Sequence, residues 1–231
     1  MAVWVTGDTH IPIDIKKLNT KLWSEGKTLT KNDYLIVCGD FGLLWKSEPD
    51  GEELYWTNWL NEKPWTTLFI DGNHENHYRL SKLKTKEMFG STVGVVSDSI
   101  YHLKRGEVYT IENKKFFCMG GALSIDKASR TEGISWWREE RSTHKEQDYG
   151  LGNLEKHNNK VDYLITHTIP SSLRNTFNDV FVTDKWYDDT CKYLDHIYNN
   201  VNFEKGYCGH WHIDVDLKKY TILYNDVIKI I

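Results

Sequence analysis

The sequence of 231 residues predicts an α/β fold. Three apolar runs in the first third, residues 2–5, 34–38 and 66–70, are typical of buried strands. Segments with helical spacing of apolar residues separate these runs, and strand–helix units of this length predict parallel strands with right-handed crossovers. Each run is followed by a polar cluster that contains glycine. The three clusters are therefore expected at one edge of one sheet, where open α/β sheets bind ligands.

Two helices are predicted between these strands. The first is indicated by apolar residues three or four positions apart, and the second by a similar set that stops near Pro64. The two sets are Ile15, Leu18, Leu22 and Trp23, and Leu54, Trp56, Trp59 and Leu60.

The rest of the chain is expected to add shorter strands and one further helix. Short antiparallel strands come first, with a turn over residues 112–115, and two later strands end at His167 and His210. The tail is predicted to close as a hairpin around Asn225-Asp226. The ranges are 100–102, 108–111 and 116–119 for the antiparallel strands, 161–166 and 206–209 for the later strands, 190–198 for the helix, and 221–224 and 227–231 for the hairpin.

A single domain over residues 1–231 is expected, because no repeat, linker or low-complexity tract interrupts the chain. Within it, the segment 122–148 carries the aromatic pair Trp136-Trp137 and is highly charged over residues 126–148. We expect this segment to form a lid or substrate loop.

Composition and charge argue against several classes of function. The chain has 33 acidic and 29 basic residues, a formal net charge of -4 and no basic stripe, so we expect no duplex DNA as a partner. No basic-then-apolar leader precedes Asp8, and no apolar stretch approaches the ~20 residues of a membrane-spanning helix. We therefore expect a cytoplasmic protein with no membrane partner. The four cysteines form no Cys-x-x-Cys pair and are expected to be buried, reduced thiols.

Five polar clusters supply the side chains that a two-metal phosphoester-hydrolysing site requires. Asp40 follows a strand and suits a carboxylate that bridges two cations. Asp8 and His10 are two residues apart, as are His210 and His212, so in extended loops the side chains of each pair project the same way. The clusters are Gly7-Asp8-Thr9-His10, Gly39-Asp40-Phe41-Gly42, Gly72-Asn73-His74-Glu75, Thr166-His167-Thr168 and Gly209-His210-Trp211-His212.

The order of these clusters resembles the calcineurin-like metallophosphoesterases. Their pattern is Asp-x-His, Gly-Asp, Gly-Asn-His-Asp/Glu, a lone His and Gly-His-x-His, and all of these blocks are present between Asp8 and His212. The resemblance implies a four-layer α/β/β/α sandwich with the metal site at the carboxyl ends of its strands. It also implies two ligand sets that share one residue. These are Asp8, His10, Asp40 and His212 for one metal, and Asp40, Asn73, His167 and His210 for the other.

The resemblance gives His74 a role different from that of its neighbour Asn73. In the family, the His of the Gly-Asn-His block is not a ligand. Carried over, His74 would contact the phosphate and protonate or stabilise the leaving oxygen, and His is the usual proton donor near pH 7. The alternative is a residue that only hydrogen-bonds a metal ligand.

The chain departs from the protein phosphatases of the family at its second block. Those enzymes carry Gly-Asp-x-x-Asp-Arg-Gly, whereas residues 39–45 lack the second Asp and the Arg, which disfavours phosphoprotein substrates. Arg130 and Lys127 are the nearest cations for a phosphate, on a loop that follows Gly120-Gly121. This loop resembles a Gly-Gly-Ala…Ser-Trp-Trp run of bacterial and phage members. The alternative is a solvated loop that two tryptophans anchor to the core.

Residues outside the blocks are expected to serve the structure. Trp45, Trp56 and Trp59 are expected to pack in the core and on a helix, although they also suit stacking on a base or sugar. The remaining histidines are expected at the surface or at helix caps. They are His77, His102, His144, His157 and His196.

Together these residues predict a hydrolase that acts on phosphoric ester bonds. We expect a dinuclear centre whose metal-bridged hydroxide attacks a phosphomonoester or phosphodiester while His74 assists the leaving group. The expected cofactors are two divalent metal ions, with Mn first and Fe or Zn as alternatives. The expected substrate is a phosphorylated small molecule or a nucleotide. Two other functions stay open: a nuclease or cyclic-nucleotide phosphodiesterase on the same scaffold, and a non-catalytic metal-binding scaffold.

Overall fold

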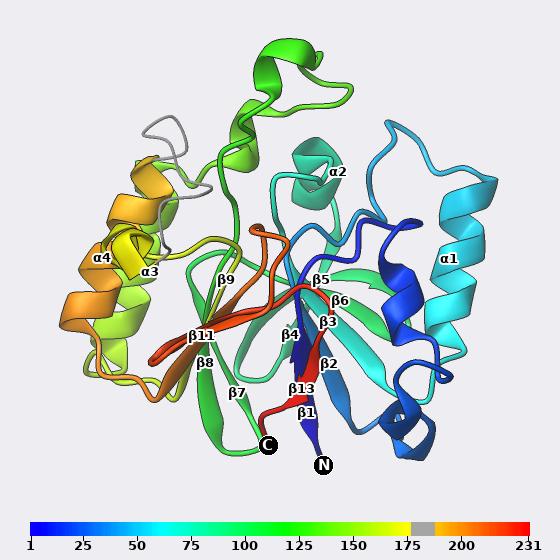
Figure 1. Ribbon diagram of the computed structural model, residues 1–231, viewed down its shortest axis with the longest axis horizontal. Helices are drawn as coiled ribbons and strands as arrows, with labels where there is room; N and C mark the ends of the chain where they lie inside the picture. Colours follow the sequence, from blue (N-terminus) through cyan, green and yellow to red (C-terminus); the bar gives the residue numbers. More distant parts are fainter. Residues whose placement is uncertain (177–187) are drawn as a thin grey trace.

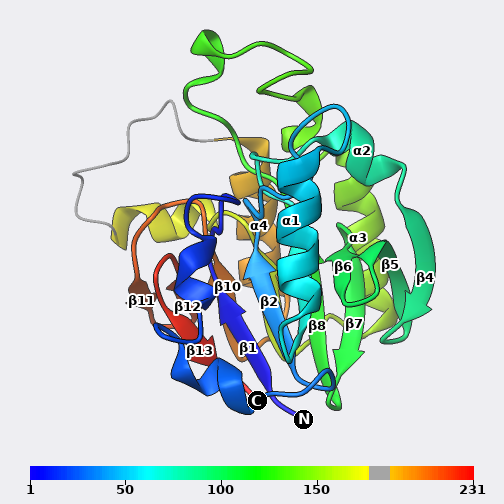
Figure 2. The ribbon, with the colours of Figure 1, turned by 90° about the vertical axis from the view of Figure 1, so that its right-hand side faces the viewer.

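Two β-sheets stack face to face, and helices cover their outer faces (Figure 1). The computed structural model describes residues 1–176 and 188–231. Figure 2, turned by 90°, shows α1 in front of one sheet and α3 and α4 on the far side of the molecule. The predicted α/β fold is confirmed, and the order helix, sheet, sheet, helix is that of the expected sandwich.

A seven-stranded sheet contains the three strands that the first third of the sequence predicts. Its order is β13-β1-β2-β3-β6-β5-β4, and β1, β2, β3 and β6 run parallel. The middle strands β2 and β3 are buried on both faces, which explains their continuous apolar runs. The strands are β13 (Val227–Lys229), β1 (Val3–Thr6), β2 (Tyr34–Cys38), β3 (Thr66–Ile70), β6 (Ile100–Leu103), β5 (Ser91–Ser97) and β4 (Lys84–Met88).

A six-stranded sheet is built from the second half of the chain. Its order is β11-β12-β10-β9-β8-β7, with β12, β10, β9 and β8 parallel. The β7–β8 hairpin turns at Glu112 and Asn113, whose φ angles of 51° and 61° are left-handed, so the predicted turn is present but shorter. The strands are β11 (Val215–Leu217), β12 (Tyr220–Ile222), β10 (Lys205–Cys208), β9 (Tyr163–Thr166), β8 (Lys114–Met119) and β7 (Glu107–Ile111).

Three apolar cores separate the four layers. Side chains from both sheets, among them Ile36 and Phe116, fill the central core. Leu60 of α1 packs on the outer face of the seven-stranded sheet, and Leu154 of α3 and Leu194 of α4 pack on that of the six-stranded sheet. The α-helices are α1 (Gly51–Asn61), α2 (His77–Ser81), α3 (His144–Lys156) and α4 (Asp189–Asn200), with 3₁₀ turns at Ile15–Leu18, Ser24–Thr28, Lys127–Ser129, Arg138–Glu140 and Ser171–Thr176.

The carboxyl ends of strands from both sheets meet at one edge of the sandwich. Because β1, β2 and β3 are parallel, the loops after them lie side by side, as predicted. The loops after β9 and β10 reach the same place from the other sheet. The His167 ring hydrogen-bonds the carbonyl of Cys38 at the end of β2, with a 2.8 Å separation. All five polar clusters therefore converge between the two sheets.

The predicted first helix is wrong. Ile15 and Leu18 lie in a short 3₁₀ turn that ends where Asn19 takes an extended conformation (φ −67°, ψ 133°), and Leu22 and Trp23 lie in the link to a second 3₁₀ turn at Ser24–Thr28. Ile15 and Leu18 are fully buried, but Leu22 is 74% exposed. The spacing of Ile15 and Leu18 therefore reflects their burial against the sheet and does not indicate an α-helix.

The predicted C-terminal hairpin is also wrong, because its two strands join different sheets. β12 pairs with β10 and β11, whereas β13 pairs with β1. The Asp214 carboxylate accepts backbone N–H groups of Tyr224, Asn225 and Asp226, which holds the link between the sheets. Helix α3, which begins at His144, takes up the last residues of the predicted segment 122–148.

Two predictions on the chemistry of the chain can be compared with the structure. All four cysteines are free and buried, which confirms the expected reduced thiols. Across residues 1–176 and 188–231, every helix is too short or too polar to cross a membrane.

Candidate metal centre

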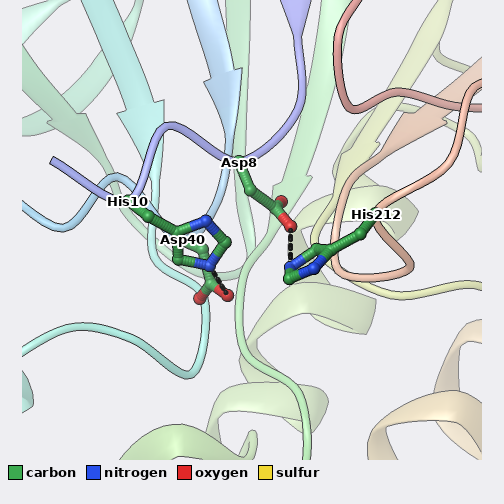
Figure 3. Close-up of side chains that lie close together, drawn as sticks. All are labelled: Asp8, His10, Asp40 and His212. Atoms are coloured by element: carbon green, nitrogen blue, oxygen red, sulfur yellow. Dashed lines mark hydrogen bonds and ion pairs between the residues drawn. The ribbon is translucent and has the colours of Figure 1, made fainter. Parts of the chain in front are cut away.

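Four of the predicted ligands form one group around a common space (Figure 3). Asp8, His10, Asp40 and His212 each place a ligand atom within 4.8 Å of the others. His10 Nε2 lies 3.2 Å from Asp40 Oδ2, and His212 Nε2 lies 3.2 Å from Asp8 Oδ2. Such a set of two imidazoles and two carboxylates is typical of Zn, Fe or Mn sites.

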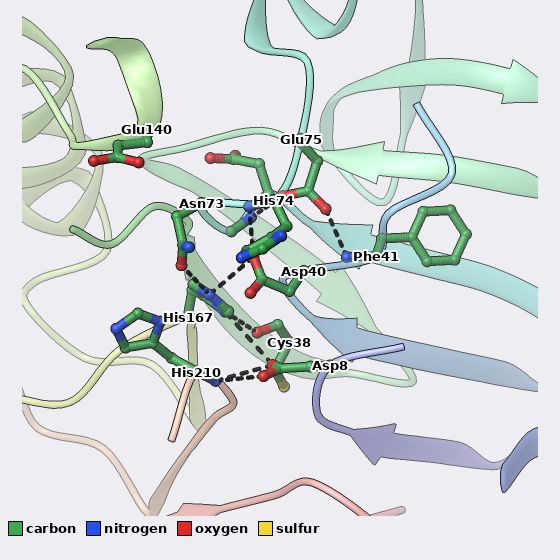
Figure 4. A network of polar contacts seen from close by, with 12 residues as sticks. Asp8, Cys38, Asp40, Phe41, Asn73, His74, Glu75, Glu140, His167 and His210 are labelled. Carbon is green, nitrogen blue, oxygen red and sulfur yellow. Dashed lines mark hydrogen bonds and ion pairs between the residues drawn. The ribbon is translucent and has the colours of Figure 1, made fainter. Parts of the chain in front are cut away.

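A second group shares Asp40 with the first (Figure 4). Asp40, His167 and His210 lie within the same 4.8 Å limit, and Asn73 Oδ1 lies 3.1 Å from His167 Nε2. The two carboxylate oxygens of Asp40 face different groups, since Oδ1 lies 3.2 Å from His167 Nε2 and Oδ2 lies near His10. The structure thus brings together all seven predicted ligand residues, and their roles as ligands stay predictions.

The hydrogen bonds of two histidines test whether a cation fits this centre. His167 Nδ1 donates to the carbonyl of Cys38, and His10 Nδ1 lies 2.8 Å from the carboxylate of Asp14. Both partners are acceptors, so Nδ1 carries a proton, and Nε2 faces the oxygens of Asp40, where either a second proton or a cation can lie between them. Lone pairs that converge in this way repel unless a positive charge lies between them. The donor set therefore fits one cation on each side of Asp40.

The charges of the buried side chains indicate the same need for positive charge. Burial favours neutral imidazole, but the Asp40 carboxylate outweighs it and raises the pKa of His167 to about 10 and that of His10 to about 9. Burial likewise favours neutral Asp40, yet His167 and His10 hold the pKa of Asp40 well below its usual range. Protons on two histidines thus supply the positive charge that bound cations would otherwise supply.

Metal affinity is therefore expected to rise with pH. Ligand imidazoles must lose their protons to bind a metal, and the raised pKa values of His10 and His167 keep those protons in place up to about pH 9. Between pH 6 and 8 the Mn²⁺ affinity should increase by ~10-fold per pH unit for each proton released. Calorimetric titration in buffers of different ionisation enthalpy measures both the Mn²⁺ affinity and the number of protons released. An affinity that does not change with pH would contradict this charge assignment.

The backbone at the centre is held in conformations that are rare for these residue types. His10, Asp40, His210 and His212 have φ angles of 32°, 46°, 69° and 51°. Such angles persist only where surrounding contacts enforce them, and they cluster at functional sites. Glycines at the neighbouring positions allow the approach of the ligands. A Cβ atom at Gly72 would lie 2.1 Å from Asp40 Oδ1, and one at Gly209 would lie 2.0 Å from Asp8 Oδ1.

Glu75 ties the loops after β2 and β3 together. It is fully buried, and its Oε1 accepts the backbone N–H groups of Phe41 at 2.6 Å and Gly42 at 3.1 Å. Its Oε2 accepts the N–H group of Gly72. One carboxyl group thereby fixes the backbone directly after Asp40 and directly before Asn73, a role that the sequence did not assign.

Glu75→Ala should destabilise the protein strongly, even without metal. The change leaves three buried N–H groups without an acceptor and opens a cavity, which should cost about 3 kcal/mol or more of unfolding free energy. Urea unfolding of the metal-free protein measures the loss. Glu155→Ala on the exposed face of α3 serves as the matched control. An unchanged unfolding midpoint for Glu75→Ala would show that these hydrogen bonds contribute little.

Asn73 is connected to the segment 122–148 through Ser124. Its Nδ2 donates to Ser124 Oγ at 3.2 Å, and the Ser124 N–H donates to Glu140 Oε1 at 3.0 Å. The first bond orients the amide so that Oδ1 faces His167. Ser124 and Glu140 are both buried, so the base of the segment is part of the same polar network as the predicted ligand.

His74 lies beside both ligand groups without belonging to either, and its ring lies edge-on to that of His10, with 5.1 Å between centroids. Its backbone N–H donates to Asp40 Oδ1 at 2.8 Å, and its ring stacks on Trp45 with 5.4 Å between centroids. Arg130 Nη2 lies 3.0 Å from His74 Nε2, and since a guanidinium only donates, this nitrogen is unprotonated here. Burial lowers the pKa of His74, and nearby Arg130 acts in the same direction.

The two predicted phosphate-binding cations differ in position. Arg130 lines a cavity of about 240 Å³ together with Asp40, Asn73 and His74. Lys127 lies outside the lining of this cavity and places its Nζ 5.8 Å from the ring centroid of Trp136. The structure thus brings Arg130, but not Lys127, to the candidate centre.

Two histidines expected at the surface are buried instead. His102 Nε2 lies 3.2 Å from Asp71 Oδ1, and His77 is also buried beside Asp71. Arg105 pairs with the same carboxylate at 2.6 Å and donates to the backbone carbonyls of Glu139 and Glu140. This buried pair joins the strand that leads to Asn73 with the segment that carries Arg130. A buried Asp paired with an Arg distant in sequence leaves no local signal.

Comparison with known proteins identifies the family. Residues 1–214 match the calcineurin-like phosphoesterase family. The chain belongs to this family. The predicted resemblance is thereby confirmed, and family membership supports the predicted class of enzyme, a hydrolase of phosphoric ester bonds.

Two known proteins are similar to this calcineurin-like phosphoesterase. A lariat debranching enzyme of Schizosaccharomyces pombe is 26% identical over 188 residues, which cover 75% of this chain and 38% of that enzyme. The chain thus spans well under half the length of that relative. The crystal structure of a phosphopantetheinyl hydrolase of Mycobacterium tuberculosis superposes with a TM-score of 0.50 and 16% identity, over 96% of this chain and 88% of the hydrolase. At this identity the likeness concerns the fold alone.

Proposed function

We propose that the protein hydrolyses phosphoric esters at a centre of two divalent metal ions. Asp8, His10, Asp40 and His212 would hold one ion, and Asp40, Asn73, His167 and His210 the other. The observation that supports this most strongly is that the two oxygens of Asp40 face two separate groups of ligand atoms. When bound, such ions supply positive charge to the phosphate and an activated water as the nucleophile.

We also propose roles for two residues beside the centre, His74 at the leaving group and Arg130 at the phosphate. Hydrolysis adds the water oxygen to phosphorus and breaks the bond to the alcohol, whose oxygen must gain a proton. His74 lies at the wall of the cavity, where it can approach this leaving oxygen. Arg130 contacts His74 Nε2 at 3.0 Å in the absence of substrate. A bound phosphate offers Arg130 stronger acceptors, and once Arg130 moves to them, His74 Nε2 is free to carry the proton.

Arg130→Ala is expected to weaken phosphate binding more than Lys127→Ala, a matched change on the same loop. Loss of a charge-assisted hydrogen bond should raise the inhibition constant of inorganic phosphate by ~10–100-fold. Lys127 is exposed and lies outside the cavity, so its removal should have a much smaller effect. Competitive inhibition of ester hydrolysis by inorganic phosphate measures the inhibition constant of each variant. Equal effects of the two substitutions would contradict the role of Arg130.

The segment 122–148 is proposed as the substrate loop within a single domain over residues 1–231. Ser124 and Glu140 anchor its base to Asn73, while the part with Arg130 lies over the cavity. The substrate class we propose is a phosphorylated small molecule or a nucleotide.

A pair of synthetic substrates tests the proposed function. Mn²⁺-dependent hydrolysis of p-nitrophenyl phosphate and of bis(p-nitrophenyl) phosphate would be measured side by side. Turnover of either one supports the proposal, and the preference distinguishes a phosphomonoesterase from a phosphodiesterase. Mn²⁺ binding without turnover of these or of other phosphoesters would instead support a non-catalytic metal-binding scaffold.

A further inference from the structure

A second cavity lies directly beside the candidate metal centre. It has a volume of about 330 Å³ and includes two residues of the centre, His10 and His74. Most of its other lining is apolar or aromatic. The principal side chains are Ile11, Pro12, Leu43, Trp45 and Trp56.

His74 forms part of the wall of both cavities. The smaller one contains Asp40, Asn73 and Arg130, the groups suited to a phosphate, and the larger one contains none of these. In an ester bound at the centre, the phosphate occupies the first cavity and the bond that breaks points toward His74. The larger cavity is therefore placed to receive the leaving group.

The aromatic side chains of this second cavity are firmly positioned. Trp45 stacks on His74 with an interplanar angle of 18°, and Trp137 packs edge-on against Trp45 at 5.0 Å. Trp56 belongs to α1 and also lines the cavity. Planar walls of this kind favour a planar ring between or upon them, because stacking tolerates many ring systems.

The charges at the rim of this cavity are already paired. Among the described residues that line it, Lys46 is the one Lys or Arg, and it contacts the carboxylates of Asp50 and Glu52. Glu53 forms a two-fold hydrogen bond with Arg79, at 2.6 and 2.7 Å. The described lining thus offers no unpaired Lys or Arg to bind a second phosphate or a carboxylate of the leaving group. An uncharged leaving group suits the cavity best.

We propose that this cavity binds the leaving group of the substrate and that this group is an uncharged planar ring system, as in a nucleoside. The inference rests on the proposed phosphoesterase function. It narrows the substrate class to phosphoesters of ring-bearing alcohols such as nucleotides. It disfavours nucleic acid strands that continue with further phosphates on the leaving side.

Trp56 is the residue to test, because Trp45 contacts His74 and its loss would disturb the centre. Equilibrium dialysis would measure the binding of adenosine, a leaving group without phosphate, with ribose as the comparison. Adenosine should bind the wild-type protein better than ribose, and Trp56→Leu should weaken adenosine binding about tenfold or more. Trp56→Phe should restore most of it, and Tyr78→Leu, an exposed aromatic residue outside the cavity, should leave it unchanged. Equal adenosine binding by wild type and Trp56→Leu, or none by the wild type, would overturn the inference.

Kinetics with two leaving groups separates this inference from the proposed function. The KM of adenosine 5′-monophosphate should rise in Trp56→Leu much more than that of glycerol phosphate. Equal changes for the two substrates would overturn the leaving-group assignment although hydrolysis itself proceeds. If no phosphoester is hydrolysed but adenosine binding still depends on Trp56, the proposed function fails and the planar-ring site is supported.

Discussion

Asp40→Ala is expected to abolish hydrolysis and to remove most of the bound metal. Asp40 is buried, and its two oxygens face both ligand groups, so its loss removes the carboxylate that joins them. The loss should exceed the ~10–100-fold that typically follows removal of an outer hydrogen-bond partner of a metal ligand. Metal content after dialysis and turnover with Mn²⁺ measure the two effects.

Two control substitutions show how large the effect of Asp40→Ala must be to support a bridging role. Asp14→Asn keeps an acceptor for His10 Nδ1 but removes its negative charge and no predicted ligand, so it should cost ~10–100-fold in metal affinity. Asp216→Asn on β11 changes an exposed carboxylate in the other sheet and should have no effect. Full activity of Asp40→Ala would disprove the assignment of the centre, whereas an effect no larger than that of Asp14→Asn would remove Asp40 from the bridging role.

His74→Ala is expected to retain the metal and to lose turnover. Removal of a general acid typically lowers the rate ~10²–10⁴-fold, and the ligand groups of the centre do not include His74. The loss should depend on the leaving group. An alkyl phosphate needs a proton on its departing oxygen, whereas p-nitrophenolate leaves without one.

The comparison of these two substrates decides the role of His74. A large loss with the alkyl ester and a small one with the p-nitrophenyl ester would identify His74 as the group that assists the leaving oxygen. The same loss with both would indicate that His74 contributes by binding the phosphate. Loss of metal from the variant would make His74 a ligand or a structural support, although the two groups of ligand atoms do not include it.

The strands of the fold were predictable where burial is complete. The predicted ranges 34–38 and 66–70 coincide with β2 and β3, because a strand buried on both faces is a continuous apolar run. The α-helix predicted around Ile15 and Leu18 was wrong, because a 3₁₀ turn against a sheet can bury residues at the same spacing as an α-helix. The predicted C-terminal hairpin was wrong because β13 pairs with β1, at the other end of the chain, and such pairing leaves no local signal in the sequence.

The candidate ligands were predictable because each belongs to a short motif with glycine beside it. Their supporting residues were not, since each depends on a partner that only the fold brings near. Ser124 reaches Asn73, and Glu75 accepts N–H groups from the loop after β2. Burial of His77 and His102 follows in the same way from the pair of Asp71 with Arg105, which are distant in sequence.

The most direct test of the two-metal centre is an anomalous-scattering measurement on crystals of the protein grown with Mn²⁺. Two anomalous peaks are expected, one on each side of the Asp40 carboxylate. The first should lie among Asp8, His10 and His212, and the second among Asn73, His167 and His210. A single peak, or peaks that do not contact Asp40, would contradict the shared-carboxylate centre.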